Sequence, residues 1–516
     1  MEKMTNKYHL MAGLCILIGL AAFGYYLTAG AAQAQIQKPK GPIIRGRVIS
    51  SYGPVENARV RIAGSEKYTL TDREGRYEIA HSYPPGQPLM VTAGKEGWFN
   101  NGQLADRSGR IADISLNPIY LDDRPDYRFI SPVTCSRCHV NLTRYYDQSK
   151  MAHTTSNPKV LDMYYGTDAL LRKGMGPGYR IDNPGNQGNC TQCHAPSVAG
   201  AIPWSQDLND VLRSPRTEWD GISCDYCHKV RKVIKDKNKA SGRAAVLERQ
   251  SPIRGNSILV FGPYDDVTAP PMAASYNPVF DKGQFCSLCH SHFKKLASGQ
   301  TWDSTKVYTT AEWEGFGLEG NNYLPIQTTY QEWKQWQDQL PPDDANKGKK
   351  CQDCHLSWRK EMLPYDNYVV DGNARNMWGT YRSPKDIRPH HFDGGTETQL
   401  KTALAMELEG EISENTLLLS VFITNTNGGH WVPTGETMRS VMLLLNVTDS
   451  NGKPLEMLNG SRLPKKSVAF KFEFAIADPE DEPTAEARLI YRPVIRPLAT
   501  IKNWDAKDIL ITSTVW

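Results

Sequence analysis

The sequence predicts a multidomain chain of three folded parts: an N-terminal β-sandwich, a central domain that is mainly α-helical and irregular, and a C-terminal β-sandwich. Two observations predict this division. Residues 41–121 and 400–516 contain runs that alternate apolar and polar side chains, with the period of two that half-buried strands require. Residues 122–398 are rich in Gly, Pro, Asn and Asp and hold five copies of the pattern Cys-x-x-Cys-His. The roughly 480 residues that follow an apolar N-terminal segment are too many to fold around one hydrophobic core, so about three domains are expected.

The N-terminal part reads as six strands joined by polar turns, with a tight turn at Asp72–Gly75. The strings Gly46–Val48, Asn57–Val60 and Thr71–Tyr77 resemble the carboxypeptidase regulatory-like domain. The resemblance implies a binding or spacer module and no peptidase activity. His81 is the only histidine of this part and is expected at the surface. The predicted strands are Ile43–Ile49, Ala58–Ala63, Tyr68–Thr71, Arg76–Ile79, Leu89–Ala93 and Ile111–Leu116.

The central part owes its chemistry to the five repeated motifs. Two thiols three residues apart can add to the two vinyl groups of one haem, and the histidine that follows is held beneath the iron as the proximal ligand. Disulfides, zinc knuckles and thioredoxin-like pairs do not require a histidine directly after each second cysteine. We therefore predict five covalent c-type haems, whose porphyrins supply much of the apolar core of a haem-nucleated domain. The motif residues are Cys135, Cys138 and His139; Cys190, Cys193 and His194; Cys224, Cys227 and His228; Cys286, Cys289 and His290; and Cys351, Cys354 and His355.

The cysteine and histidines outside the motifs are the candidates for a disulfide and for the sixth ligand of each iron. Ten of the eleven cysteines belong to the motifs, which leaves only Cys15 and no pair for a structural disulfide. The identity of each sixth iron ligand separates electron transfer from catalysis. Five histidines outside the motifs, the N-terminal segment and the first β-sandwich are candidates: His153, His292, His390, His391 and His430.

Sequence position constrains these candidates differently. His292 follows His290 by two residues and cannot reach the opposite face of the same haem, so as a ligand it would bind a neighbouring iron. Met151 competes with His153 as a ligand. His390 and His391 are adjacent and would point in opposite directions from an extended segment, so one ligand is expected more than two. His430 follows two glycines at the predicted tip of the C-terminal sandwich, where it could reach into the haem domain and dock the two together.

Several of these segments resemble the multihaem cytochromes of nitrification and anammox, in particular the nitrifier tetrahaem cytochrome type. The resemblance covers about residues 128–445 and is carried by Gly221–His228, by Tyr330–Trp333 with Gly348–His355, and by Gly429–Gly435. In that family a histidine commonly stands where this chain has Met151. The resemblance implies haem cofactors and redox partners.

The C-terminal part returns to strand periodicity, with a Gly-rich loop at 425–429 and a tight turn at Asp449–Gly452. A short helix is predicted between the two sandwiches at Thr329–Trp336. The predicted C-terminal strands are Leu417–Ile423, Arg439–Val447, Val468–Phe474 and Ile509–Val515.

The N-terminus predicts export. Lys3 and Lys7 precede an apolar stretch at 10–27, and Ala32-Gln-Ala34 matches the small-x-small cleavage pattern of signal peptides. Cleavage after Ala34 and retention of 10–27 as a membrane anchor are both open. Both place the rest of the chain in the periplasm or at the cell surface, where haem is attached to this motif in bacteria.

The leading functional hypothesis is extracytoplasmic electron transfer through five closely packed haems, with redox proteins as partners. The alternative is a multihaem oxidoreductase that acts on a small nitrogen or sulfur compound at one five-coordinate iron. A third reading is adhesive, with β-modules that bind a surface to which the haems deliver charge. The net charge of +4 without a sustained basic run gives no support to nucleic-acid binding. The sequence leaves the oligomeric state open.

Overall fold

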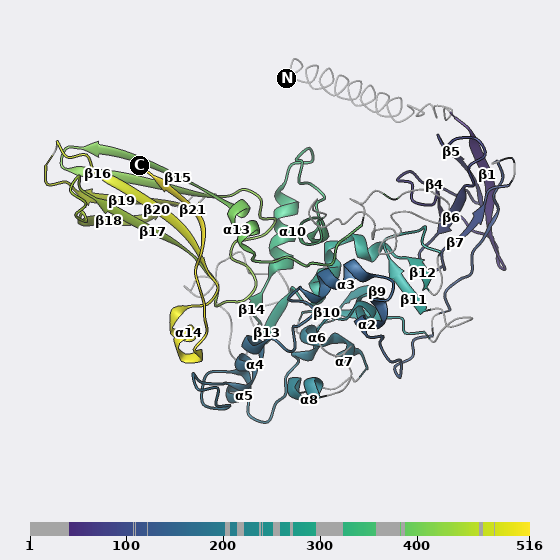
Figure 1. Cartoon of the computed structure of the whole chain (residues 1–516), viewed down its shortest axis with the longest axis horizontal. Helices are drawn as coiled ribbons and strands as arrows, with labels where there is room; N and C mark the ends of the chain where they lie inside the picture. Colours follow the sequence, from purple (N-terminus) through teal and green to yellow (C-terminus); the bar gives the residue numbers. More distant parts are fainter. Residues whose placement is uncertain are drawn as a thin grey trace, which may run out of the picture.

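The computed structural model describes residues 41–516 with gaps at 107, 109, 121, 202–206, 214–220, 237–238, 240, 251–257, 269–271, 296–322, 358–381, 383–386, 464–467 and 479. The predicted signal or anchor in residues 1–34 lies outside the described residues. Within the described ranges, no helix is both long and apolar enough to cross a membrane. Figure 1 shows the two strand-rich ends of the chain on opposite sides of the central region that carries the haem motifs.

The N-terminal part forms two four-stranded sheets around one apolar core. The first pairs β1 (Ile43–Ser50) with β2 (Gly53–Pro54), β5 (Arg76–Ala80) and β8 (Ile114–Ser115). The second has the order β4 (Thr69–Leu70), β3 (Arg59–Ile62), β6 (Met90–Gly94) and β7 (Asn101–Leu104). Each of the six predicted segments contains a strand, and β2 and β7 were not expected.

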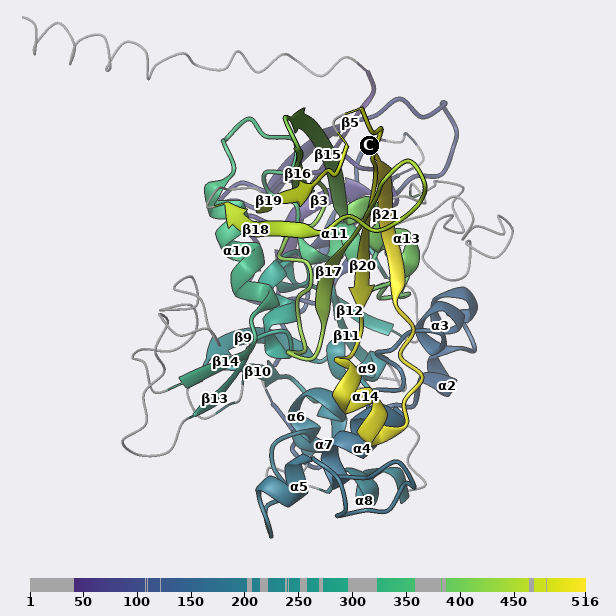
Figure 2. The same ribbon diagram turned by 90° about the vertical axis from the view of Figure 1, so that its left-hand side faces the viewer.

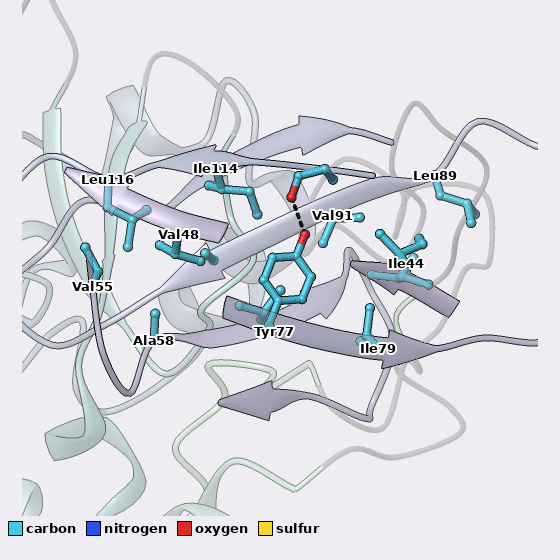
Figure 3. Packing of buried hydrophobic residues seen from close by; sticks show 14 residues of the cluster. Ile44, Val48, Val55, Ala58, Tyr77, Ile79, Leu89, Val91, Ile114 and Leu116 are labelled. Carbon is cyan, nitrogen blue, oxygen red and sulfur yellow. Dashed lines mark hydrogen bonds between the residues drawn. The ribbon is translucent and has the colours of Figure 1, made fainter. Parts of the chain in front are cut away.

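Side chains from both sheets meet in the core of this part (Figure 3). Ile44 and Val48 from β1 are fully buried with Val91 from β6, because alternate residues of each strand face inward. Burial of each such side chain is worth about 1.5–3 kcal/mol. The Tyr77 hydroxyl also lies in this core, where it donates to the Ala112 carbonyl over 2.5 Å, so its one polar group is satisfied.

The central part is built from short helices, as predicted, but it also contains three strand pairs that were not predicted. The pairs are β9 (Val230–Lys235) with β10 (Arg243–Leu247), β11 (Ile258–Gly262) with β12 (Met272–Tyr276), and β13 (His292–Lys295) with β14 (Tyr323–Gln327). They are too short for a clear period, and their pairing depends on neighbours distant in sequence. The helices are α2 (Pro132–Cys135), α3 (Val140–Asp147), α4 (Pro158–Tyr165), α5 (Tyr179–Asp182), α6 (Thr191–His194), α7 (Pro196–Ala201), α8 (Leu208–Arg213), α9 (Cys224–Cys227), η2 (Pro278–Asp281), η3 (Gly283–Leu288), α10 (Thr329–Gln339) and α11 (Cys351–His355).

The C-terminal part consists of two antiparallel sheets. One has the order β15 (Leu404–Ser413), β16 (Thr416–Asn425), β19 (Val468–Ala475) and β18 (Met457–Leu463); the other has the order β17 (Ser440–Thr448), β20 (Thr484–Arg492) and β21 (Ile509–Val515). Leu417 and Phe474 from one sheet pack with Val447 and Ala485 from the other. The four predicted strands are confirmed, whereas β15, β18 and β20 were missed. Helices α13 (Glu397–Ala403) and α14 (Arg496–Lys502) complete this part.

Buried polar contacts join both ends to the central part. Asp265 binds Arg59 over 2.5 Å and Arg61 over 2.8 Å, which ties β3 to the loop after β11. At the other end, the Lys502 ammonium of α14 donates to the carbonyls of Asp162, Thr167 and Pro177 at 2.5–3.0 Å. Figure 2 shows α14 beside α4 accordingly. These contacts fix how each strand-rich part sits on the motif-bearing core.

Candidate haem centres

Each of the five motifs forms a single helical turn. The histidine N–H donates to the carbonyl of the first cysteine over 2.9 Å at His139, His194 and His290 and over 3.0 Å at His228. The fifth motif coincides with α11. In such a turn, residues i, i+3 and i+4 share one face, so both thiols and the imidazole project toward the same side. This is the arrangement that two thioether bonds and one axial bond to a single porphyrin require.

The imidazoles of three motif histidines are oriented by backbone carbonyls. His228 Nδ1 lies 2.6 Å from the Phe261 carbonyl, and His194 Nδ1 lies 3.0 Å from the Thr154 carbonyl. His355 Nδ1 makes the same contact with the Asp393 carbonyl. A carbonyl can only accept, so Nδ1 carries the proton in each ring and the lone pair of the neutral imidazole is on Nε2. Each ring therefore has the tautomer that an iron ligand needs.

Two of these imidazoles face a second imidazole across a gap. The ring centroids of His355 and His430 are 6.1 Å apart with planes 5° apart, and those of His228 and His390 are 6.4 Å apart with planes 32° apart. Two imidazoles bound to opposite sides of one metal, each at about 2 Å through a ring nitrogen, have centroids roughly 6 Å apart. Both gaps fit one iron.

The facing histidines have the same tautomer as the motif histidines. His430 Nδ1 lies 2.8 Å from the Trp431 carbonyl, and His390 Nδ1 lies 2.8 Å from the Arg388 carbonyl. Burial, followed by the neighbouring His228, lowers the pKa of His390 to about 4. Burial also lowers the pKa of His430. Both rings are therefore neutral at pH 7 with Nε2 unprotonated, as ligation requires.

His292 and His290 lie in two different surroundings. Burial lowers the pKa of His292, Glu436 opposes this shift, and the nearby His194 adds to it. His292 therefore lies within electrostatic range of His194, the histidine of the second motif. Burial, with His355 and His430 next, lowers the pKa of His290 to about 4. Among the described residues, no imidazole faces His290 at the separation seen in the two pairs.

His391 and His153 have their Nε2 atoms on protein carbonyls. His391 is 6% exposed; its Nε2 lies 2.9 Å from the Ser357 carbonyl, and its Nδ1 accepts the Asp393 N–H over 3.2 Å. The proton therefore resides on Nε2, opposite to the facing histidines. His153 is exposed, and its Nε2 lies 2.8 Å from the Asp147 carbonyl. Met151 is half-buried, and its carbonyl accepts the Ile222 N–H just before the third motif.

The motifs lie side by side in an order that differs from the sequence. Thiols of different motifs shift one another's pKa values: the pKa of Cys135 is lowered beside Cys224, that of Cys193 beside Cys289, and that of Cys351 beside Cys286, and the partner thiol has its pKa raised in each pair. The first motif thus neighbours the third, and the fourth neighbours both the second and the fifth.

The thiols lie in apolar surroundings. Burial raises the pKa of Cys190 to about 11 and that of Cys227 to about 12. In the described ranges, no group of three or more His, Cys, Asp or Glu side chains is arranged to hold a bare metal ion. The donor set fits an iron held in a porphyrin, which needs only one or two axial protein ligands.

Two buried carboxylates that support the motifs were missed in the sequence. Asp225, inside the third motif, binds Lys229 Nζ over 2.6 Å and accepts from the Tyr127 hydroxyl and the Ile130 N–H. Glu332 on α10 accepts the Trp431 N–H beside His430. Glu332 lies in the Tyr330–Trp333 string that carried part of the family resemblance, so a signal for it existed. The carbonyls that orient the imidazoles leave no mark in a sequence.

The chain shows little similarity to known proteins. No protein-family model and no curated protein matches the chain. Among solved structures, a penta-heme cytochrome c552 from Thermochromatium tepidum superposes with a TM-score of 0.46 and 15% sequence identity, over 76% of this chain and all of that one.

Proposed function

We propose that this chain is an electron-transfer protein that carries five covalent c-type haems outside the cytoplasm. The observation that carries the proposal is the pair of imidazole gaps, His355 to His430 and His228 to His390, each of the width that one iron fills. Bound haem would supply one-electron chemistry, and at the irons held between these two pairs an imidazole on each face would leave no open position for a substrate. The predicted periplasmic or cell-surface location and redox-protein partners are part of the proposal.

The proposed ligand set uses the histidine of every motif as the proximal ligand. His390 is the second ligand opposite His228, His430 opposite His355, and His292 opposite His194. The tautomers support the first two, and the electrostatic proximity of His292 to His194 supports the third. His391 is excluded from the set, since its Nε2 is held by the Ser357 carbonyl.

The neighbouring thiols support a connected path. The first and third haems would lie next to each other, and the fourth would lie between the second and the fifth. Cys227 of the third motif is close enough to act electrostatically on Cys286 and Cys289 of the fourth. All five haems would then be linked through adjacent neighbours, with the third and fourth at the junction.

The second candidate is an oxidoreductase that acts on a small nitrogen or sulfur compound, and the surroundings of His290 favour it. Among the described residues, no imidazole faces His290 at the separation of the two pairs, so the haem of the fourth motif would have an open position; the proposed ligand set also assigns no second ligand at the first motif. Because the fourth motif adjoins the second, third and fifth motifs, electrons could pass between its haem and the other haems.

Spectroscopy on substituted proteins tests the ligand set. A pyridine haemochrome assay should give five haems per chain, and three or fewer would contradict the pentahaem proposal. The His390→Ala variant should convert one haem from low to high spin in electron paramagnetic resonance. The matched control is His391→Ala, which removes the adjacent ring and should leave every spin state unchanged. The reverse outcome would assign the ligand to His391.

Carbon monoxide separates the two functions. Reduced protein that binds no CO would mean that every haem, including those of the first and fourth motifs, has a second protein ligand, and this supports the electron carrier. Stoichiometric binding at one haem, together with steady consumption of hydroxylamine, nitrite or a sulfur oxyanion, would favour the oxidoreductase.

A further inference from the structure

Glu332 is a buried carboxylate at the contact between α10 and the loop that carries His430. Its exposure is 3%. One carboxylate oxygen, Oε2, accepts the backbone N–H of Trp431 over 3.0 Å. The other, Oε1, accepts the hydroxyls of Thr434 and Thr328, each over 3.1 Å. Burial raises the pKa of the Glu332 carboxyl to about 7, and the three hydrogen bonds that it accepts oppose this shift without cancelling it.

A second contact passes this restraint on to His430. The Trp431 carbonyl lies 2.8 Å from His430 Nδ1 and fixes the rotation of the imidazole. The residue whose N–H is held by Glu332 is therefore the same residue whose carbonyl orients the ring. The imidazole that results is parallel to that of His355 within 5°.

The loop that carries His430 makes two further contacts with α10, and neither involves Trp431. The Thr329 and Thr434 hydroxyls are 2.8 Å apart. Trp336 packs against Gly429, where a Cβ atom would come within 2.9 Å of the indole. Glu332 thus gives α10 a direct hydrogen bond to the residue next to His430.

We propose that Glu332 is a positioning residue that sets the imidazole of His430 opposite that of His355. The proposal rests on the assignment of these two histidines to one iron. Two acceptor oxygens suit this place, because glutamine would offer one acceptor and turn an NH₂ group toward a donor. The role is to hold a ligand at a fixed distance and rotation, which tunes the haem between them.

The test uses the full haem-loaded protein with Glu332→Gln. Hydrogen exchange of a peptide covering residues 425–437 should quicken about tenfold, as expected for loss of one buried hydrogen bond. One of the haem signals in electron paramagnetic resonance should shift or become high spin, and the others should stay unchanged. Glu332→Asp, which keeps the charge but shortens the reach, should change the same signal and serves if the Gln variant does not fold.

The matched control is Thr329→Val. It removes a hydrogen bond between the same helix and the same loop but leaves the contact of Glu332 with Trp431 intact. An unchanged haem spectrum in this variant together with a changed one in Glu332→Gln supports the positioning role. Equal changes in both variants would overturn it, since any weakening of the interface would then move the haem.

His430→Ala separates the two proposals. If it changes no haem signal, the assignment of His430 to an iron fails, and the role of Glu332 fails with it. If His430→Ala converts one haem to high spin while both Glu332 variants keep native spectra, only the positioning role is overturned.

Discussion

Removal of the Lys229 ammonium should destabilise the centre of the motif-bearing part. Lys229 is 0% exposed and its Nζ has two partners, Asp225 Oδ1 and the Leu259 carbonyl, each at 2.6 Å. Asp225 is 5% exposed and joins the third motif to the preceding segment through Tyr127 and Ile130. In Lys229→Met, the carboxylate stays buried without its counter-charge.

The expected magnitude follows from which partners remain. Loss of one member of a buried ion pair costs about 3–5 kcal/mol. Asp225 keeps two donors in Lys229→Met, so the loss should lie near the lower limit, at about 3 kcal/mol. Asp225→Asn should cost about as much, because Lys229 keeps only the Leu259 carbonyl and meets an amide that also donates. The double variant should lose about 3–4 kcal/mol instead of the sum of roughly 6, which corresponds to a coupling of about 2–3 kcal/mol.

Urea unfolding of the four proteins as isolated with their haem, followed by the Soret band, measures this coupling in the motif-bearing part. The matched control is Lys334→Met, which breaks an exposed pair with Asp338 and should cost about 0.5 kcal/mol or less. Strictly additive losses in the double variant would refute the reasoning, because the two charges would then not depend on each other.

Two further substitutions test how the strand-rich ends are attached. Lys502→Met should remove the hydrogen bonds from α14 to three carbonyl acceptors and lower the free energy of unfolding by about 2–4 kcal/mol. It should also expose residues 496–507 to limited proteolysis, and an unchanged digestion pattern would contradict this. Asp265→Ala should leave the buried Arg61 and the half-buried Arg59 without their carboxylate, cost about 3 kcal/mol and open the linker at 117–130 to protease. Glu78→Ala, which breaks an exposed pair with Arg45, should do neither, and equal effects of the two would refute the docking role of Asp265.

Strand periodicity and turn chemistry were readable from the sequence. The alternation in Ile43–Ile49 and Leu417–Ile423 predicted β1 and β16, because one face of each strand must be apolar. Asp449–Gly452 was readable as a turn, since Asp449 accepts the N–H groups of Asn451 and Lys453 and Gly452 adopts φ of 78°. The strand β15 was missed although it alternates, because its outward residues are mostly glutamates that resemble a solvated loop.

The chemistry of the motifs is equally local. A cysteine, a second cysteine three residues later and the adjacent histidine share one face of a helical turn whatever surrounds them. The sequence by itself therefore predicts where haem would be attached, and both the attachment and the haem count stay predictions for the haemochrome assay.

The choice of ligands depended on tertiary structure. His390 and His391 are neighbours with the same local sequence, yet the carbonyl of Arg388 leaves Nε2 of one ring available, and the carbonyl of Ser357 takes Nε2 of the other. Which histidine faces His228, which thiols adjoin, and which carboxylate holds the loop of His430 are all set by contacts between distant segments. Periodicity and motif spacing depend only on residues that are close in the sequence. Every residue has a backbone carbonyl, so which carbonyl orients an imidazole is decided only when distant segments pack together.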